Sequence, residues 1–338
     1  MQAVYWYQKA ASQGFAMAQT NLGVCYANGQ GVLQDYKQAV YWYQKAADQG
    51  YASAQTNLGL CYANGQGVPQ DHKQAVFWYQ KAADQGYALA QTNLGLCYAI
   101  GQEVPQDHKQ AVFWCQKAAA QGQATAQANL GVCFHNGRGV PQDHMQAVYW
   151  YQKAADQGYV LAQTNLGVCY ANGQGVPQDH KQAVYWYQKA ADQGYVSAQT
   201  NLGLCYANGQ GVPQDHKQAV SWCQKAAAQG DAMGQTQLGI CFQNGQGVQQ
   251  DLKQAVSWYQ KAAAQGQATA QTNLGFCFQN GRGVLQDDKQ AVYWYQKAAD
   301  QGYALAQTNL GVCYAKGQGV PQDHKQAVFW YQKAADQE

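Results

Sequence analysis

The sequence is poor in charged residues and contains no long apolar segment. Only 12% of its 338 residues are charged and the formal net charge is +2, so the basic surface that nucleic-acid binding requires is missing. No run of 18 apolar residues occurs, which argues against a membrane span. The first residues, MQAVYWYQKA, lack the basic start and apolar core of a secretory signal. We therefore expect no nucleic-acid partner and a cytoplasmic location, unless a native N-terminus has been trimmed away.

An internal repeat of 36 residues organises the whole chain. All ten tryptophans, from Trp6 to Trp330, are spaced by 36 residues, and nine of the eleven cysteines keep the same spacing. No linker or composition shift interrupts the array, so we expect one domain over residues 1–338. Residues 1–14 form a truncated opening second helix, and residues 15–338 form nine repeats.

Each repeat is predicted to contain two amphipathic helices joined by a glycine-rich loop. In residues 52–64 the small or apolar side chains recur at steps of three and four, as they do in residues 72–84. Asp71 and Gln74 have the spacing of a capping box at the start of the second helix. Gly59 recurs on the buried face of the first helix, which indicates close approach of a neighbouring helix.

These motifs resemble the Sel-one-like repeat (SLR) family, which is related to tetratricopeptide repeats. The matching segments are A-x-A-Q-x-x-L-G-x-x-Y (52–62), G-x-G-V (65–68), Asp71 and A-V-x-W-Y-x-K-A-A (75–83). The resemblance implies an all-α fold, a right-handed α/α solenoid superhelix whose first helices line a concave surface. It also implies a role as a scaffold or adaptor for other proteins. Some relatives bridge the two helices of each repeat by a cysteine pair, which this chain lacks.

Motifs that could bind phosphate or metal have simpler interpretations here. The stretch ANGQGVPQD (63–71) follows a predicted helix and no G-K-[ST] follows its glycines, unlike a phosphate-binding loop. Its glycines are expected to supply turn conformations, and Glu103 in place of the second glycine tests that expectation. Histidines recur at one repeat position, roughly 10 Å apart, too far for shared zinc ligation, and we expect them to be exposed: His72, His108, His144, His180, His216 and His324.

The same repetition argues against catalysis, because an active site needs a singular constellation. We therefore predict that the chain is not an enzyme and uses no cofactor or metal. Cys115 and Cys223 replace a tyrosine in the second helix. A disulfide from Cys115 to Cys97 or Cys133 is one alternative, and inert buried thiols are the expected one.

A candidate protein-binding surface lies on the first helices, where a stripe of positions varies between repeats. The stripe (repeat positions 53, 56, 60 and 63) is largely apolar and carries no arginine, which suits an apolar or helical peptide better than an acidic tail. Neutral variation at helix–helix contacts is the alternative. The recurring asparagine of this helix either bonds a ligand backbone or satisfies a loop carbonyl. The candidate residues are Ser53, Asn57, Leu60, Leu89, Asn93, Leu96, Thr125, Asn129, Val132, His135, Leu161, Asn165, Val168, Ser197, Asn201, Leu204, Met233, Ile240, Gln243, Thr269, Asn273, Phe276 and Gln279.

Two further surfaces are candidates for association. A row of aromatic residues precedes tryptophan in the second helix, beside lysine and glutamine: Tyr41, Phe77, Phe113, Tyr149, Tyr185, Tyr293 and Phe329. The sequence also starts and stops inside a second helix, so apolar surface is expected at both ends, and self-association through these ends is a further hypothesis. A peptide-binding scaffold is thus the leading hypothesis, and a structural or self-assembling array without a specific ligand is the alternative.

Overall fold

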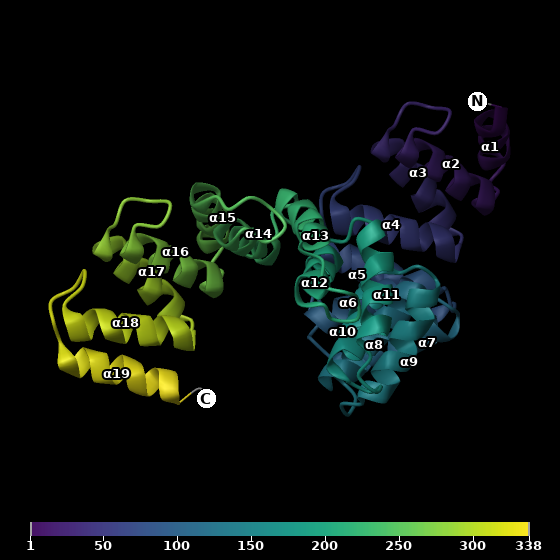
Figure 1. The fold of residues 1–338 in the computed structure, drawn as a ribbon. Coiled ribbons are helices and arrows are strands. Elements are labelled where there is room, and N and C mark those ends of the chain that lie inside the picture. The colour runs from purple at the N-terminus through teal and green to yellow at the C-terminus, as the bar shows by residue number, and fades with distance from the viewer. Residues whose placement is uncertain (1, 337–338) are drawn as a thin grey trace. The chain divides into compact units, whose positions relative to one another are not determined.

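The computed structural model describes residues 2–336, and all regular structure in this part is helical (Figure 1). A short opening helix, α1 (Gln2–Ser12), precedes the repeats. The first helices of the repeats are α2 (Ala16–Asn28), α4 (Ala52–Asn64), α6 (Ala88–Ile100), α8 (Ala124–Asn136), α10 (Val160–Asn172), α12 (Val196–Asn208), α14 (Ala232–Asn244), α16 (Ala268–Asn280) and α18 (Ala304–Lys316). The second helices are α3 (Tyr36–Asp48), α5 (His72–Asp84), α7 (His108–Ala120), α9 (His144–Asp156), α11 (His180–Asp192), α13 (His216–Ala228), α15 (Leu252–Ala264), α17 (Asp288–Asp300) and α19 (His324–Ala335).

The packing divides the chain into two compact units. One comprises the chain up to Cys169 together with Gly173–Pro177, and the other comprises Tyr170–Asn172 with the chain from Gln178 onward. Inside each unit a helix packs mainly on the helices that precede and follow it in the chain. The predicted all-α solenoid is confirmed by this arrangement. Its right-handed sense remains a prediction. No helix within residues 2–336 combines the length and the apolarity needed to span a bilayer.

The second helices begin at an aspartate, as the capping-box spacing predicted. The Asp71 carboxylate accepts a hydrogen bond from the Gln74 backbone N–H at 3.0 Å, which satisfies an otherwise unpaired donor of the first turn. The first helix instead ends at Gly65, whose left-handed conformation (φ 66°) lets its N–H reach the Cys61 carbonyl oxygen. Local chemistry thus determines where each helix begins and ends.

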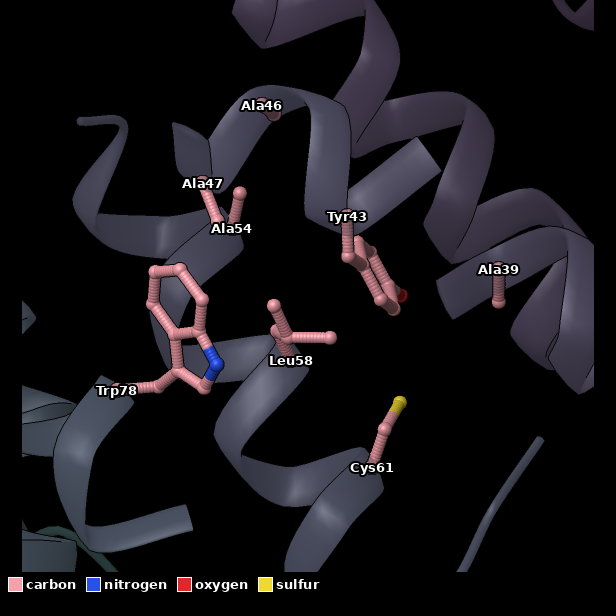
Figure 2. Packing of buried hydrophobic residues seen from close by; sticks show 8 residues of the cluster. All are labelled: Ala39, Tyr43, Ala46, Ala47, Ala54, Leu58, Cys61 and Trp78. Atoms are coloured by element: carbon pink, nitrogen blue, oxygen red, sulfur yellow. The ribbon is translucent and has the colours of Figure 1, made fainter. Parts of the chain in front are cut away.

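The core repeats with the sequence, and adjacent aromatic residues connect consecutive repeats. Trp78 packs with Tyr43 and Leu58 over the preceding α3 and α4 (Figure 2). Its neighbour Tyr79 belongs to the next cluster, formed with α6 and α7. The Tyr79 ring also lies against Gly59, where a Cβ would come within 2.6 Å of the ring. The close approach predicted at this glycine is confirmed.

Buried glutamines add a polar connection to the apolar core. Gln55 is buried in α4, and its amide N–H donates to the Ala47 carbonyl oxygen at the end of α3, at 3.2 Å. Its side-chain oxygen accepts from the Gln85 amide at the end of α5, at 2.8 Å. The same pattern recurs in both units. Because a buried amide needs partners for both of its ends, these bonds fix the relative register of three consecutive helices.

Candidate functional site

All the predicted binding residues lie on the first helices, and none of them is buried. Most are half-buried, while the exposed ones are Leu89, Leu96, Leu161, Ser197, Met233 and Phe276. The prediction that repeat position 56 belongs to the exposed stripe was wrong. Thr56 is buried, and its hydroxyl donates to the Ala52 carbonyl oxygen at 2.8 Å. The accessible stripe therefore runs through the positions of Ser53, Asn57 and Leu60. These residues remain a predicted interaction surface.

Three pockets recur on this surface at intervals of one repeat within the first compact unit. We name them by the residue that each repeat places at one shared position of the wall. The Tyr79 pocket has a volume of about 240 Å³ and is lined by Leu60, Ala63, Asn64, His72, Ala75, Tyr79, Asn93, Leu96, Cys97 and Gln102. The Cys115 pocket, of about 210 Å³, is lined by Gly95, Leu96, Ala99, Ile100, His108, Ala111, Cys115, Asn129, Val132, Cys133 and Arg138. The Tyr151 pocket, of about 270 Å³, is lined by Val132, His135, Asn136, Tyr151, Asn165 and Val168.

Each pocket combines apolar side chains of two successive first helices with the recurring asparagine. In the Tyr79 pocket these are Leu60, Leu96 and Asn93. The Asn93 amide nitrogen is buried and donates to no protein group. An unpaired buried donor is unfavourable, so a ligand carbonyl would gain a hydrogen bond there. In the second unit the equivalent Asn273 instead hydrogen-bonds Tyr259.

The walls also contain residues that sequence analysis had not assigned to the surface. Five of the six helix-start histidines are half-buried, contrary to the expectation that they are exposed, whereas His324 is exposed. His72 lies in the Tyr79 pocket with its Nδ1 3.0 Å from the Gln102 amide nitrogen. Ile100, Cys115 and Arg138 line the Cys115 pocket. Their departure from the residues found in neighbouring repeats was the available sequence signal.

His135 forms a histidine pair that the sequence did not reveal. Its ring lies 4.9 Å from that of His144 in an edge-to-face arrangement, and both Nδ1 atoms are buried without a partner. Burial, assisted by His144, lowers the pKa of His135. The neutral form of His135 is therefore favoured in the folded chain. Within residues 2–336, no three or more His, Cys, Asp or Glu side chains are grouped so that they could hold a metal ion.

The cysteines of the described chain are free thiols, so neither alternative disulfide of Cys115 is formed. Burial raises the pKa of Cys115 to about 12, with Cys133 contributing. Such a thiol stays protonated near neutral pH and behaves as a small apolar side chain. Cys133 is the half-buried exception among the cysteines. Cys115 thus affects the pocket mainly through the small size of its side chain.

The aromatic row of the second helices is about half exposed and already engaged within each helix. The Phe77 ring, 47% exposed, lies edge-to-face on Trp78 with ring centres 5.0 Å apart. The Lys81 ammonium lies 4.6 Å from the centre of the Phe77 ring, within cation–π range. Where Ser221 replaces the aromatic residue, Lys225 lies 3.8 Å from the Trp222 ring centre. The row thus provides an aromatic face that is covered by lysine side chains.

Comparison with known proteins places this geometry in a family. The Sel1 repeat matches residues 1–15, 16–51, 52–87, 88–123, 124–159, 160–195, 196–231, 232–267, 268–303 and 304–338. A crystal structure of a protective antigen of uropathogenic Escherichia coli strains, described as displaying an SLR fold, is 36% identical with a TM-score of 0.74. That alignment covers 99% of this chain and 79% of the antigen.

A Sel1 repeat protein from Oxalobacter formigenes is also 36% identical, with a TM-score of 0.64 over 88% of this chain and 86% of the relative. No curated protein matches the chain. Repeats of this family generally serve in protein-interaction scaffolds and are generally without enzymatic activity. On the evidence of ten matching repeats and the solenoid they form, this chain belongs to the Sel1 repeat family.

Proposed function

We propose that this chain is an interaction scaffold that binds a peptide or helical segment along its first helices. The observation that carries the proposal is the row of pockets at intervals of one repeat. Each pocket is large enough for a side chain and contains apolar side chains of two successive first helices, and its asparagine offers a polar group to a peptide backbone. A segment with regularly spaced apolar side chains fits this pattern.

The charge of the surface restricts the kind of peptide. The first helices contain no arginine, and Lys316 is their single lysine. Leu96 is 49% exposed and lines two successive pockets. An apolar or amphipathic segment therefore gains more from this surface than an acidic tail does.

The proposal is tested with peptides selected from a displayed random library on the immobilised protein. Affinity is then measured by fluorescence anisotropy for the wild type and for Leu96→Glu, which places a carboxylate in two apolar pockets. We expect the Kd of pocket-bound peptides to rise at least about tenfold, or 1.4 kcal/mol. Phe276→Glu places a carboxylate at the position equivalent to Leu96 in the second unit.

Leu285→Glu is the matched control, because Leu285 is 91% exposed in a loop and its change should leave the Kd unaltered. If Leu96→Glu and Phe276→Glu bind the peptides with the same Kd as Leu285→Glu, the proposed surface is rejected. A library without any saturable binder, together with a mass that grows with concentration in light scattering, would instead favour the self-assembling array.

A further inference from the structure

Two departures from the repeat change the wall of the Cys115 pocket. Ile100 stands where the Tyr79 pocket has Asn64, so an apolar side chain replaces an amide. Cys115 stands in the position of Tyr79, and the small thiol leaves Gly95 within the pocket wall. The pocket therefore reaches the backbone of α6 at Gly95. At the equivalent Gly59 of α4, the Tyr79 ring covers the backbone.

A third departure places a cation at the edge of the same pocket. Arg138 occupies the position that Gln102 has in the Tyr79 pocket. Arg138 itself lines the pocket. Its charge opposes the rise that burial causes in the pKa of the Cys133 thiol. The corresponding Arg282, four repeats further on, lies 5.4 Å from the Phe276 ring centre. Val132 replaces that ring beside Arg138, so the guanidinium is exposed and available.

The size of the pocket limits its ligand. Its volume is about 210 Å³, whereas a dry cavity of about 150 Å³ suffices to bind benzene. Drug-sized ligands occupy pockets of roughly 300 Å³ or more. A ring or chain of about ten heavy atoms is therefore the appropriate scale. Metal binding is not the alternative, because the histidine and cysteines of this wall do not form a metal-binding group within residues 2–336.

We propose that the Cys115 pocket binds a small amphipathic carboxylic acid. Its apolar ring or chain packs on Leu96, Ile100 and Cys115, and its carboxylate pairs with the Arg138 guanidinium. The pairing of an apolar cavity with a single cation at the rim selects for this chemistry over neutral or cationic ligands. The site does not depend on peptide binding elsewhere along the first helices.

The test uses 4-phenylbutanoate and its neutral analogue 4-phenylbutanol, titrated into the full chain and followed by saturation-transfer NMR. The wild type should bind the acid with a Kd of roughly 1 mM, as expected for a ligand of this size. Cys115→Tyr should weaken binding of both compounds at least tenfold. Arg138→Gln should weaken binding of the acid about fivefold and leave the alcohol unaffected. Both variants restore a residue that the array itself uses at that position, so we expect both to fold.

Cys223→Tyr is the matched control. It makes the same exchange in a repeat where Asn208 and Gln246 stand at the positions of Ile100 and Arg138, and binding should not change. Ile100→Asn provides a second pocket variant, again with the residue of the array, should Cys115→Tyr unfold. Circular dichroism confirms the folding of each variant.

Equal affinity of the acid for the wild type, Cys115→Tyr and Ile100→Asn would overturn the site. Equal loss of acid and alcohol in Arg138→Gln would overturn the ion pair. The tripeptide acetyl-Gly-Gly-Phe carries a similar ring and a C-terminal carboxylate. It should bind no more tightly than 4-phenylbutanoate, and tighter binding would assign the pocket to a peptide terminus instead of a free acid.

Discussion

The Tyr79 pocket and the Cys115 pocket are built on the same backbone pattern one repeat apart, yet they present different chemistry. In the first, a tyrosine ring covers Gly59, while in the second a thiol leaves Gly95 within the wall. In both cases the helices of two successive repeats form the walls of the pocket. The difference teaches that a repeat array can acquire an individual site through a few substitutions at positions where the frame tolerates them.

Giving each pocket the residue of the other, by Tyr79→Cys or by Cys115→Tyr, should have the largest effect on stability. Tyr79 is buried with a relative exposure of 4%, so Tyr79→Cys leaves a cavity and should cost about 3 kcal/mol. Cys115→Tyr fills space against Gly95 and should gain up to about 1 kcal/mol. Urea denaturation followed by circular dichroism measures both. A destabilised Cys115→Tyr would mean that the Cys115 repeat has repacked and no longer accepts the ring.

The glycines beneath these residues offer a sharper comparison. A Cβ on Gly59 would come within 2.6 Å of the Tyr79 ring, whereas on Gly95 the nearest atom is the Cys115 sulfur, at 2.9 Å. We expect Gly59→Ala to cost about 2 kcal/mol. Gly95→Ala should cost less than about 1 kcal/mol, because its contact with the thiol is milder than the contact of Gly59 with the ring. The higher helix propensity of alanine offsets part of that cost. Equal losses in thermal denaturation would show that the ring is not the obstacle.

The loops that follow α4 and α6 differ at one position, where the first has Gly67 and the second has Glu103. We expect a moderate effect on stability when either residue is changed. Glu103 keeps the left-handed conformation of the second loop glycine, with φ 55° against 76° at Gly67. Because this conformation costs a side-chain-bearing residue about 1 kcal/mol, Glu103→Gly should stabilise the chain by that amount. Gly67→Glu should destabilise it by more, since a Cβ there meets the Tyr36 carbonyl group. A lower melting temperature for Glu103→Gly would contradict this account.

The Tyr151 pocket differs from its neighbours by His135, and this difference should produce the smallest effect, one that depends on pH. Burial lowers the pKa of His135 in the folded chain, so the unfolded chain binds protons more readily. The stability contributed by the neutral ring is present above the unfolded pKa of about 6.5 and is lost as the pH falls below it.

His135→Ala restores the alanine of other repeats and serves as the comparison. Between pH 7.5 and 5.0 the wild type should lose more stability than this variant. Parallel pH profiles of the two proteins, measured by urea denaturation, would show that the histidine pair does not contribute.

Most of the fold could be predicted because the residues that determine each helix lie close together in the sequence. The ends of α4 and α5 follow from Asp71, Gly65 and the spacing of small residues, all of which operate within one or two turns. The buried position of Thr56 was missed because a polar residue on the stripe can turn its hydroxyl to a carbonyl of its own helix. The surface itself remains a prediction that only binding can test.

The individual character of the pockets could not be derived from periodicity. Sequence comparison between repeats marks Ile100, Cys115 and Arg138 as departures but does not show that they meet in one cavity. The contact of His135 with His144 likewise depends on how α8 and α9 pack beyond the loop that joins them. Such contacts depend on the reach of side chains between helices, and the three-dimensional packing determines them.

The central claim, that ligands bind along the first helices, is tested most directly by hydrogen–deuterium exchange of the full chain with a selected peptide. The account predicts added protection in first helices, including α6 and α8, and little change at the lysine-covered aromatic row of the second helices. Protection confined to the row around Phe77 and Phe113, with unchanged exchange in the first helices, would contradict it.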